Sequence, residues 1–124
     1  TEEENITEMG WEVSPEGMYD VLKQFGEYGK RIIVTENGAA FEDQIEGDFV
    51  HDTQRLDFYK QYIGQVLRAK QEGIPIDGYF AWTFLDNFEW AEGYHPRFGI
   101  VHVDFKTQER RIKDSGLWFR EQLR

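Results

Sequence analysis

The sequence predicts an α/β fold that forms part of a (β/α)8 barrel, and two observations carry this prediction. Expected strands alternate with expected helices along the 124 residues, as in βαβ units built on a parallel sheet. The strand expected over residues 31–35 contains Ile32, Ile33 and Val34 in succession, which is typical of a parallel strand covered on both faces. Because eight barrel units need roughly 250 residues, we expect a piece of a barrel.

The first expected element is a helix that begins after Ser14. Residues 14–16 read Ser-Pro-Glu, which combines an N-cap hydroxyl, a proline at the first helical position and an acid near the positive end of the helix dipole. Gly29 favours an end near Tyr28. The strand over residues 31–35 follows, and the turn signal Asn37-Gly38 ends it.

A second, longer helix is expected to begin after Asp52, which can cap it, and to end before Gly73 and Pro75. Its apolar residues recur near a period of 3.6 residues. These residues are Leu56, Tyr59, Ile63, Val66 and Leu67. Residues 78–84 (GYFAWTF) and 98–105 (FGIVHVDF) are the next strand candidates. A final helix is expected to begin near Ser115.

Composition excludes several classes of partner. The formal net charge is -10, which repels nucleic acid and anionic lipid surfaces. No stretch approaches the roughly 20 apolar residues that span a bilayer, and the first residues, TEEEN, lack the basic region of a secretion signal. There is no cysteine for disulfides or thiolate chemistry. We expect a soluble, cytoplasmic protein with no nucleic-acid or membrane partner.

Glu36 is the first candidate functional residue, because it follows the apolar strand directly. At the carboxyl end of a barrel strand, a carboxylate can act as nucleophile, general base or ligand. On these residues alone, the alternative is that Thr35, Glu36 and the Asn37-Gly38 pair form only a turn.

Residues 82–99 (WTFLDNFEWAEGYHPRFG) follow the next expected strand and interleave aromatic rings with carboxylates. This mixture suits a sugar, whose C–H faces stack on rings while its hydroxyls donate to acidic oxygens. Composition leaves open the alternative of a packed aromatic loop whose acids face water.

Neither a metal nor another cofactor is expected. No pair among His51, His95 and His102 has the i, i+4 helical spacing, or the cluster with carboxylates, that is expected of a zinc enzyme. The acidic segments 1–8 and 41–48 are interpreted as solvated loops.

Several motifs resemble a known family. They are TENG at 35–38, HDTQR at 51–55, GYFAWTFLDNFEWAEGY at 78–94 and RFGIVHVDF at 97–105, with TEMGWEVSPEGMYDVL at 7–22 before them. Together they resemble glycoside hydrolase family 1, and most closely its bacterial β-glucosidases. The family is a (β/α)8 barrel that hydrolyses β-glycosides with retention of configuration. The resemblance implies that residues 1–124 are the C-terminal segment of a single barrel catalytic domain, with about strands seven and eight and their helices.

The resemblance also implies roles for named residues. The reaction would be hydrolysis of terminal, unphosphorylated β-D-glucosyl residues of β-glucosides or cello-oligosaccharides, through a covalent glycosyl-enzyme intermediate. Glu36 would be the nucleophile, and Trp82 the platform under the sugar. Glu89, with Trp90 beside it, would accept hydrogen bonds from the C4 and C6 hydroxyls. Phe98 would close the apolar side near C6, and Trp11 would line the aglycone side. Arg55 resembles a structural position of the family.

Half of the site that the resemblance implies is not encoded in this sequence. The family's acid/base lies in an Asn-Glu-Pro motif, which does not occur in the 124 residues. We therefore expect the N-terminal remainder of the barrel to be a partner that supplies the acid/base. The alternative is a non-catalytic barrel fragment that only complements or binds that partner. A thioglucosidase relative, which keeps the nucleophile but lacks the acid/base, also stays open.

Overall fold

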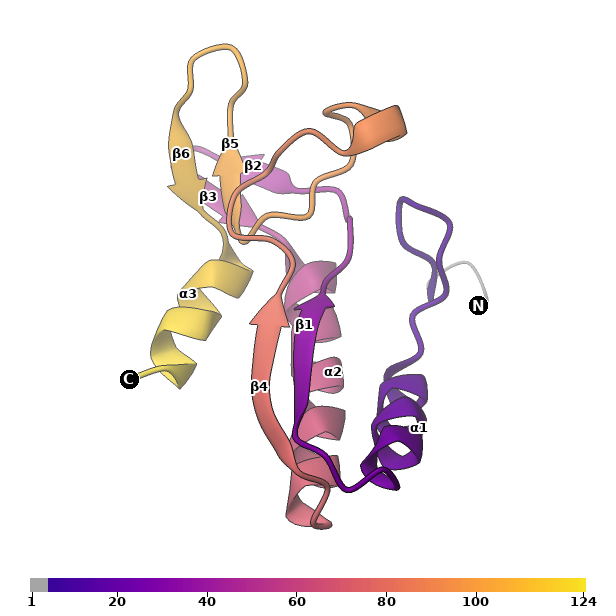
Figure 1. Ribbon diagram of the computed structural model, residues 1–124. Helices are drawn as coiled ribbons and strands as arrows, with labels where there is room; N and C mark the ends of the chain where they lie inside the picture. Colours follow the sequence, from indigo (N-terminus) through magenta and orange to yellow (C-terminus); the bar gives the residue numbers. More distant parts are fainter. Residues whose placement is uncertain (1–4) are drawn as a thin grey trace.

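The computed structural model describes residues 5–124. Its central sheet pairs two parallel strands, β1 (Ile32–Asn37) and β4 (Ile76–Ala81). The helix α2 (Thr53–Gln71) connects them and crosses one face of the sheet, with α1 (Pro15–Gly26) beside it near β1 and α3 (Asp114–Gln122) beyond β4 (Figure 1). This is the βαβ arrangement that the sequence predicts, and it brings the carboxyl ends of both strands to the same end of the molecule.

The remaining elements form loops and hairpins above that end of the sheet (Figure 1). The strands β2 (Gln44–Glu46) and β3 (Phe49–His51) form one antiparallel pair, and β5 (Val101–Val103) and β6 (Arg110–Ile112) form another. A 3-10 turn, η2 (Trp90–Glu92), lies in the long loop after β4. The hairpin of β2 and β3 occupies part of the segment 41–48 that was expected to be a solvated loop.

The first helix differs in detail from the sequence prediction. It ends at Gly26 rather than near Tyr28, and Pro15 is its first residue as expected. The side chain of Ser14 makes no capping hydrogen bond. Instead, the backbone N–H of Ser14 donates to the Tyr62 hydroxyl at 2.9 Å, which ties the start of α1 to α2.

Asp52 precedes α2, as predicted, but its side chain forms a hydrogen bond with the start of α3 instead. It makes no capping bond to α2. Its Oδ1 atom accepts a 2.9 Å hydrogen bond from the backbone N–H of Ser115 in the first turn of α3. A carboxylate in this position satisfies an otherwise unpaired donor of the helix start. The prediction of Asp52 as a cap was therefore wrong about which helix it caps.

The strand bounds also differ from the sequence prediction. β4 ends at Ala81, so residues 82–84 lie beyond it, and the strand expected over 98–105 is reduced to β5. The physical reason is that β4 pairs only with β1 within residues 5–124, and Asn37 is the last β1 residue that can meet it, opposite Ala81. Trp82 still bonds to Asn37, but residues 83, 84 and 86 bond to the segment 98–101.

Two apolar clusters form the core. The first packs α1, α2 and the sheet around Leu22, Val66 and Ile76, and the second is an aromatic cluster around Phe58, Tyr59 and Phe41. Each buried side chain of this size contributes roughly 1.5–3 kcal/mol of burial free energy.

The opposite face of the sheet is open in this chain. Ile33 of β1 is 47% exposed and Phe80 of β4 is 61% exposed, because alternate residues of a strand point to opposite faces. The expectation of a strand covered on both faces is therefore not met within residues 5–124. An apolar groove of about 900 Å³ lies between α2, β4 and α3, lined by Leu67, Phe84 and Trp118 among others.

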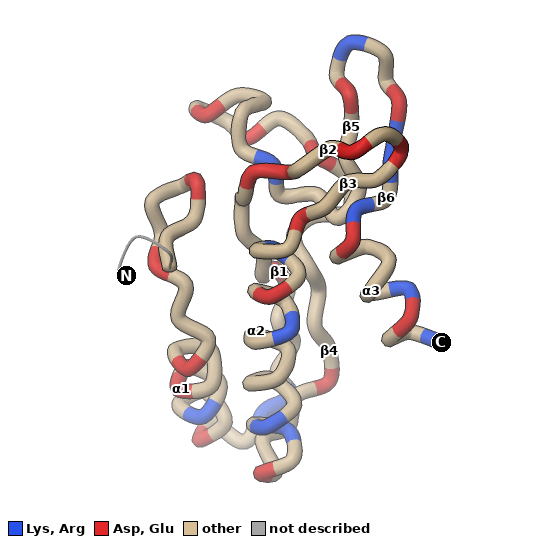
Figure 2. Tube along the Cα trace, turned by 180° about the vertical axis from the view of Figure 1, so that it is seen from behind, with Lys and Arg blue, Asp and Glu red and all other residues tan. Residues whose placement is uncertain are grey.

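Acidic residues occur along the helices and loops rather than in one tail (Figure 2). Of the helices in residues 5–124, none combines the length and the apolar character that crossing a bilayer requires.

Candidate active site

An open pocket of about 590 Å³ lies at the carboxyl ends of β1 and β4. It is lined by twelve residues from the first loop, β1, α2 and the loop after β4. They are Thr7, Trp11, Glu12, Glu36, Asn37, Gly38, Phe58, Tyr62, Trp82, Glu89, Trp90 and Phe98. The structure therefore brings together all six of the site residues predicted from the sequence.

Glu36 is the penultimate residue of β1 and not the residue after a shorter strand, as the sequence indicated. The strand extends because the Asn37 carbonyl accepts a 2.8 Å hydrogen bond from the backbone N–H of Trp82. The side chain of Glu36 lies on the exposed side of the strand and lines the pocket. Glu36 lies in an irregular stretch of the register, between Val34, which pairs with Tyr79, and Asn37, which pairs with Ala81. These flanking pairs favour a fixed position for the carboxylate.

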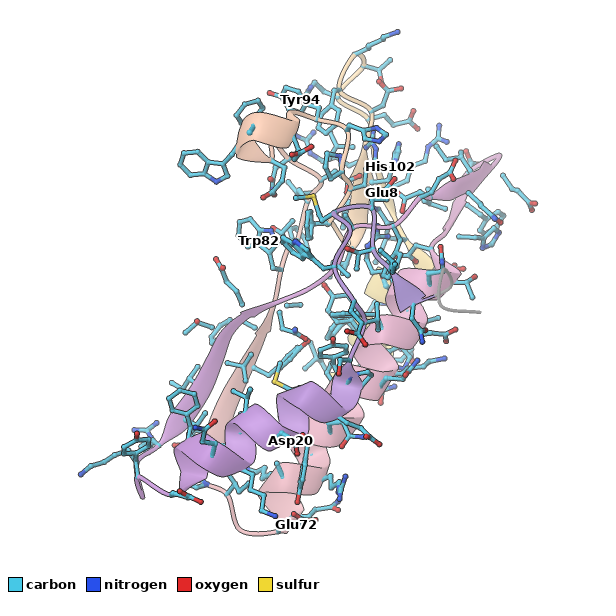
Figure 3. All side chains as sticks on the ribbon, turned by 90° about the vertical axis from the view of Figure 1, so that its right-hand side faces the viewer. Glu8, Asp20, Glu72, Trp82, Tyr94 and His102 are labelled. Carbon is cyan, nitrogen blue, oxygen red and sulfur yellow. The ribbon has the colours of Figure 1, made fainter. Side chains whose placement is uncertain are left out.

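Gly38 allows the chain that carries Glu36 to approach Trp82. A Cβ atom on Gly38 would lie 1.7 Å from the carbonyl oxygen of Trp82, far closer than two non-bonded atoms can approach. The same carbonyl accepts a 3.0 Å hydrogen bond from the Tyr59 hydroxyl on α2. Trp82 lies between the sheet and the loop that carries Tyr94 (Figure 3), and its peptide bond to Thr83 is cis. Tyr59 and Gly38 therefore fix the backbone of Trp82 beside β1.

Glu89 and Trp90 lie at the start of the turn η2. The Glu89 backbone N–H donates to the Gly93 carbonyl at 2.7 Å, which closes this turn. Glu89 is half-buried, whereas Trp90 is 84% exposed. Glu89 and Trp90 thus border the pocket from the loop opposite the first loop of the chain.

Phe98 and Trp11 approach each other across the pocket. Phe98 is 4% exposed, and its ring centre lies 6.3 Å from that of Trp11 in a tilted arrangement. The hydroxyl oxygen of Thr7 accepts hydrogen bonds from the backbone N–H groups of Met9 and Trp11, at 3.3 and 3.2 Å. Thr7 is buried, so the prediction of a solvated loop over residues 1–8 is wrong at this residue. Residues 1–4 of that prediction lie outside the described residues.

Several residues that line the pocket were not predicted from the sequence. Phe58 and Tyr62 lie one helical turn apart on α2, and their rings stack with centres 4.0 Å apart. An aromatic pair at i, i+4 was the available signal, but neither residue was among the periodic apolar residues on which the helix was predicted. Asn37 was interpreted only as a turn residue, yet its side-chain oxygen accepts a hydrogen bond from Tyr79 of β4 at 2.7 Å.

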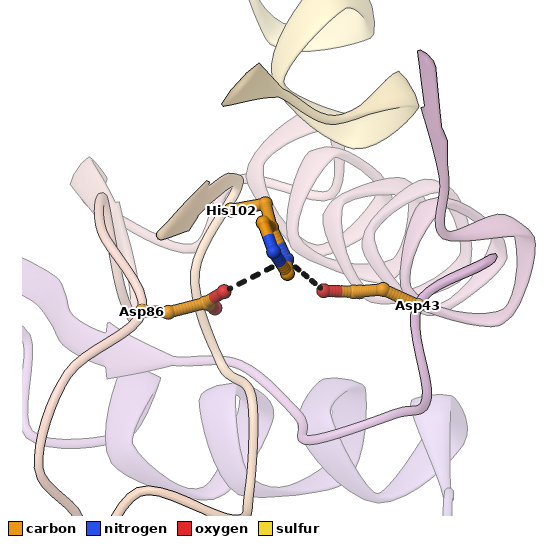
Figure 4. Close-up of side chains that lie close together, drawn as sticks. All are labelled: Asp43, Asp86 and His102. Carbon is orange, nitrogen blue, oxygen red and sulfur yellow. Dashed lines mark hydrogen bonds and ion pairs between the residues drawn. The ribbon is translucent and has the colours of Figure 1, made fainter. Parts of the chain in front are cut away.

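A buried cluster of charges lies behind the pocket, in a region where solvated acids were expected. His102 lies between Asp43 and Asp86 (Figure 4), with its Nδ1 atom 3.3 Å from Asp43 Oδ2 and 3.6 Å from Asp86 Oδ2. Burial alone would raise the pKa of Asp43, but Arg55 and Lys113 lower it below its usual value. Asp43 is thus an ion-pair partner, which corrects the interpretation of residues 41–48.

The same three side chains are close enough to hold a metal ion. However, Arg55 and Lys113 contact Asp43 at 2.8 and 2.7 Å, and Arg97 and Lys113 contact Asp86 at 2.8 and 2.9 Å. Three cationic side chains therefore already neutralise the two carboxylates, and the arrangement is that of an ion-pair network. Arg55, which the resemblance presented as structural, has no exposed side-chain surface.

The parallel sheet, with helices on one face and a pocket of carboxylates and aromatic rings at the strand ends, has the arrangement of a portion of a (β/α)8 barrel. The pattern of the family described as Glycosyl hydrolase family 1 matches residues 1–124. The chain belongs to this family.

Individual relatives agree with this membership. The chain is 56% identical over 116 residues to β-glucosidase A of Thermotoga maritima, covering 91% of this chain and 26% of the relative. It is 44% identical over 121 residues to a bifunctional β-D-glucosidase/β-D-fucosidase of Bifidobacterium breve, covering 92% of this chain and 26% of the relative. The chain therefore spans about a quarter of the length of these relatives.

A solved structure shows the same fold. The β-glucosidase from Thermotoga maritima in complex with glucoimidazole superposes with a TM-score of 0.92 at 54% identity, covering 95% of this chain and 28% of the other. The predicted fold, part of a family 1 (β/α)8 barrel, is confirmed by this match.

Proposed function

We propose that this chain is the part of a retaining β-glucosidase that supplies the nucleophile, Glu36, and part of the site for the sugar. The observation that carries the proposal is the convergence of Glu36, Trp82 and Glu89 on one pocket at the strand ends. Retaining glycosidases use a carboxylate nucleophile in such a pocket, and relatives of this chain are β-glucosidases. The substrate class is terminal, unphosphorylated β-D-glucosyl residues.

In the proposed reaction, the Glu36 carboxylate attacks the anomeric carbon and forms a glycosyl ester. A second carboxylic acid, about 5–5.5 Å from the first in retaining enzymes, protonates the leaving oxygen and then activates water. Trp82 offers an indole face for the sugar ring, and Glu89 accepts hydrogen bonds from its hydroxyls. The arginines Arg55 and Arg97 pair with Asp43 and Asp86, and neither of them lines the pocket.

The partner in this proposal is the N-terminal remainder of the barrel, which supplies the acid/base. Ile33 and Phe80 on the open sheet face, and the groove of about 900 Å³ beside β4, form an apolar surface that this remainder covers. Apolar patches of this extent are seldom left in water. Neither nucleic acid nor a membrane is a proposed partner, because the net charge is -10.

The test is a Glu36→Gln substitution in the protein assembled with the remainder of the barrel. Glutamine keeps the shape but removes the anionic nucleophile, so hydrolysis of an aryl β-glucoside should fall by several orders of magnitude. The control is Glu42→Gln, since Glu42 is an exposed carboxylate six positions further along and not in the pocket. A 2-deoxy-2-fluoro glucoside should label the wild-type peptide at Glu36. Normal turnover of Glu36→Gln, or a label on another residue, would contradict the assignment.

A second candidate function is a non-catalytic barrel fragment that only binds its partner. The exposed sheet face and the groove beside β4 favour it for the chain by itself. Mixing the chain with the N-terminal remainder and measuring both assembly and hydrolysis separates the two functions. An assembled complex without any activity would support the second function and contradict the first.

A further inference from the structure

Lys113 connects the two loops that form the candidate active site. It precedes α3, and its ammonium group has no exposed surface. The Nζ atom lies 2.7 Å from Asp43 Oδ2 and 2.9 Å from Asp86 Oδ1. Asp43 belongs to the loop that follows Glu36, and Asp86 belongs to the loop that follows Trp82. One cation therefore joins both sides of the pocket from behind.

Asp86 organises the loop that carries Glu89 and Phe98. Its Oδ1 atom also accepts a 2.9 Å hydrogen bond from the backbone N–H of Gly99, the residue after Phe98. Its Oδ2 atom accepts bonds from Arg97 at 2.8 Å and from the backbone N–H of Val103 at 3.3 Å. A Cβ atom on Gly99 would lie 2.7 Å from the Asp86 carboxylate, so this close approach requires the glycine.

Asp43 organises the loop after the nucleophile through Arg55. Asp43 Oδ1 accepts a 2.8 Å bond from Arg55, whose guanidinium also donates to the carbonyls of Ala39 and Phe41 at 3.3 and 2.8 Å. The same guanidinium donates to the carbonyl of Arg97 in the other loop. Arg55 and Lys113 therefore each contact both loops and hold them together.

The charges of this cluster balance. Three carboxylates, Asp43, Asp52 and Asp86, are paired with the three cations Arg55, Arg97 and Lys113. Removing the Lys113 charge leaves two buried carboxylates sharing fewer cations, and such groups separate or draw in water. Because buried networks have few alternative arrangements, their loss moves the attached backbone.

We infer that Lys113 is a positioning residue of the active site, which sets the placement of the Glu36 loop relative to the loop of Trp82, Glu89 and Phe98. This inference rests on the proposed function of the pocket. Lys113 does not touch the pocket, so its effect reaches the substrate only through Asp43 and Asp86. A displacement of about 1 Å between reacting groups can lower the rate by about 100-fold.

The experiment compares variants of the protein assembled with the remainder of the barrel. Lys113→Met removes the charge and keeps the length of the side chain. The double variant Lys113→Met/Asp43→Asn removes one cation and one anion, so the charges stay balanced while the bridge is lost. Lys113→Arg keeps the charge in a longer, forked side chain, and Lys106→Met, in an exposed turn, is the control.

We expect the double variant to melt near the wild-type temperature but to show kcat/KM lowered by about 10- to 100-fold. The ratio of kcat/KM between gluco and galacto substrates should also become smaller in the double variant, because Glu89 moves relative to Glu36. Lys113→Arg should fold and show the same decrease to a smaller extent, and Lys106→Met should match the wild type. A role in stability alone would lower the melting temperature and leave the selectivity unchanged.

Glucose binding, followed by tryptophan fluorescence, separates this inference from the proposed function. One outcome is that the wild type is active and that the double variant and Lys113→Arg keep its rates, selectivity and glucose affinity. This outcome would overturn the role of Lys113 and leave the proposed function standing. An inactive wild-type assembly that binds glucose, with affinity lost in the double variant, would overturn the proposed function and support the positioning role. If the wild-type assembly is inactive and the double variant binds glucose as tightly as the wild type does, both the proposed function and the positioning role of Lys113 are overturned.

Discussion

The hydroxyl of Tyr79 donates a 2.7 Å hydrogen bond to the side-chain oxygen of Asn37, the residue that follows Glu36. Tyr79 lies on β4 and Asn37 on β1, so this bond crosses the sheet directly beside the proposed nucleophile. Burial raises the pKa of Tyr79, which keeps its hydroxyl protonated as a donor at neutral pH.

Tyr79→Phe in the assembled protein should therefore leave Asn37 without its partner. We expect a loss of about 1 kcal/mol in the free energy of unfolding, the usual net value of one such bond, and a fall of a few-fold in kcat, since the end of β1 becomes less fixed. Urea unfolding and initial rates measure the two effects. Tyr28→Phe is the control, because Tyr28 is 72% exposed. Equal behaviour of both variants would show that the bond does not hold Asn37.

Gly38→Ala tests the close approach of the two loops. The added methyl group would lie 1.7 Å from the Trp82 carbonyl oxygen, so one of the two segments must move. We expect a strong loss of activity on an aryl β-glucoside and a destabilisation of several kcal/mol, as for overpacked buried sites.

The matched control for that substitution is Gly17→Ala in α1, where the atom nearest to an added Cβ is the Oγ of Ser14, at 3.2 Å. The Ser14 side chain makes no capping hydrogen bond and can turn away. Alanine is the better helix former by about 1 kcal/mol, so Gly17→Ala should be neutral or stabilising, with normal activity. Full activity of Gly38→Ala would mean that the loops tolerate a wider separation than the structure indicates.

Local patterns predicted the helices and strands that position the site, but not the hydrogen bonds and ion pairs between residues distant in sequence that fix it. The apolar run of Ile32, Ile33 and Val34 predicted β1, and the 3.6-residue period predicted α2, because burial imposes a period on each element. The ends of elements depended on partners distant in sequence. β1 continues to Asn37 because of a hydrogen bond to Trp82, which no local pattern encodes.

The charged cluster illustrates what the sequence could not indicate. Asp43 stands in an acidic segment and was interpreted as solvated, yet its partners Arg55 and Lys113 lie outside that segment, and Lys113 is near the other end of the chain. Charge patterning within a segment does not reveal such pairs, because they depend on the tertiary fold. By contrast, the motifs that resemble the family named the six pocket residues that the structure brings together. Their individual roles stay predictions.

Glu89→Ala tests the role of this carboxylate in sugar selection. If Glu89 accepts hydrogen bonds from the sugar hydroxyls, its loss should lower the discrimination between gluco and galacto substrates by roughly 10- to 100-fold, the value of a charged hydrogen bond. The ratio of kcat/KM for the two aryl glycosides measures this. Glu92→Ala is the matched control, since Glu92 lies three residues away in the same turn and does not line the pocket. Unaltered discrimination in Glu89→Ala would exclude the role.

The pair of His51 and Asp114 joins the end of β3 to the start of α3 and should make stability depend on pH. The His51 Nδ1 atom lies 2.7 Å from Asp114 Oδ2. This hydrogen bond raises the pKa of His51, with further contributions from Glu46 and Asp52, against a lowering by burial. The protonated imidazole therefore stabilises the fold. This stabilisation is complete below the ordinary histidine pKa of about 6.5 and is lost as the pH rises through the raised value.

His51→Gln should accordingly destabilise the assembled protein more at about pH 5.5 than at about pH 8.5, on either side of the ordinary histidine pKa. Urea unfolding at both pH values measures the difference in destabilisation. This difference should become smaller at high salt concentration, because the pair of His51 and Asp114 is partly exposed and is therefore screened. His95→Gln is the control, since His95 is exposed in the loop after η2. A deficit of the same size at both pH values would mean that the imidazole is neutral in the fold and that the hydrogen bond to Asp114 does not depend on its charge.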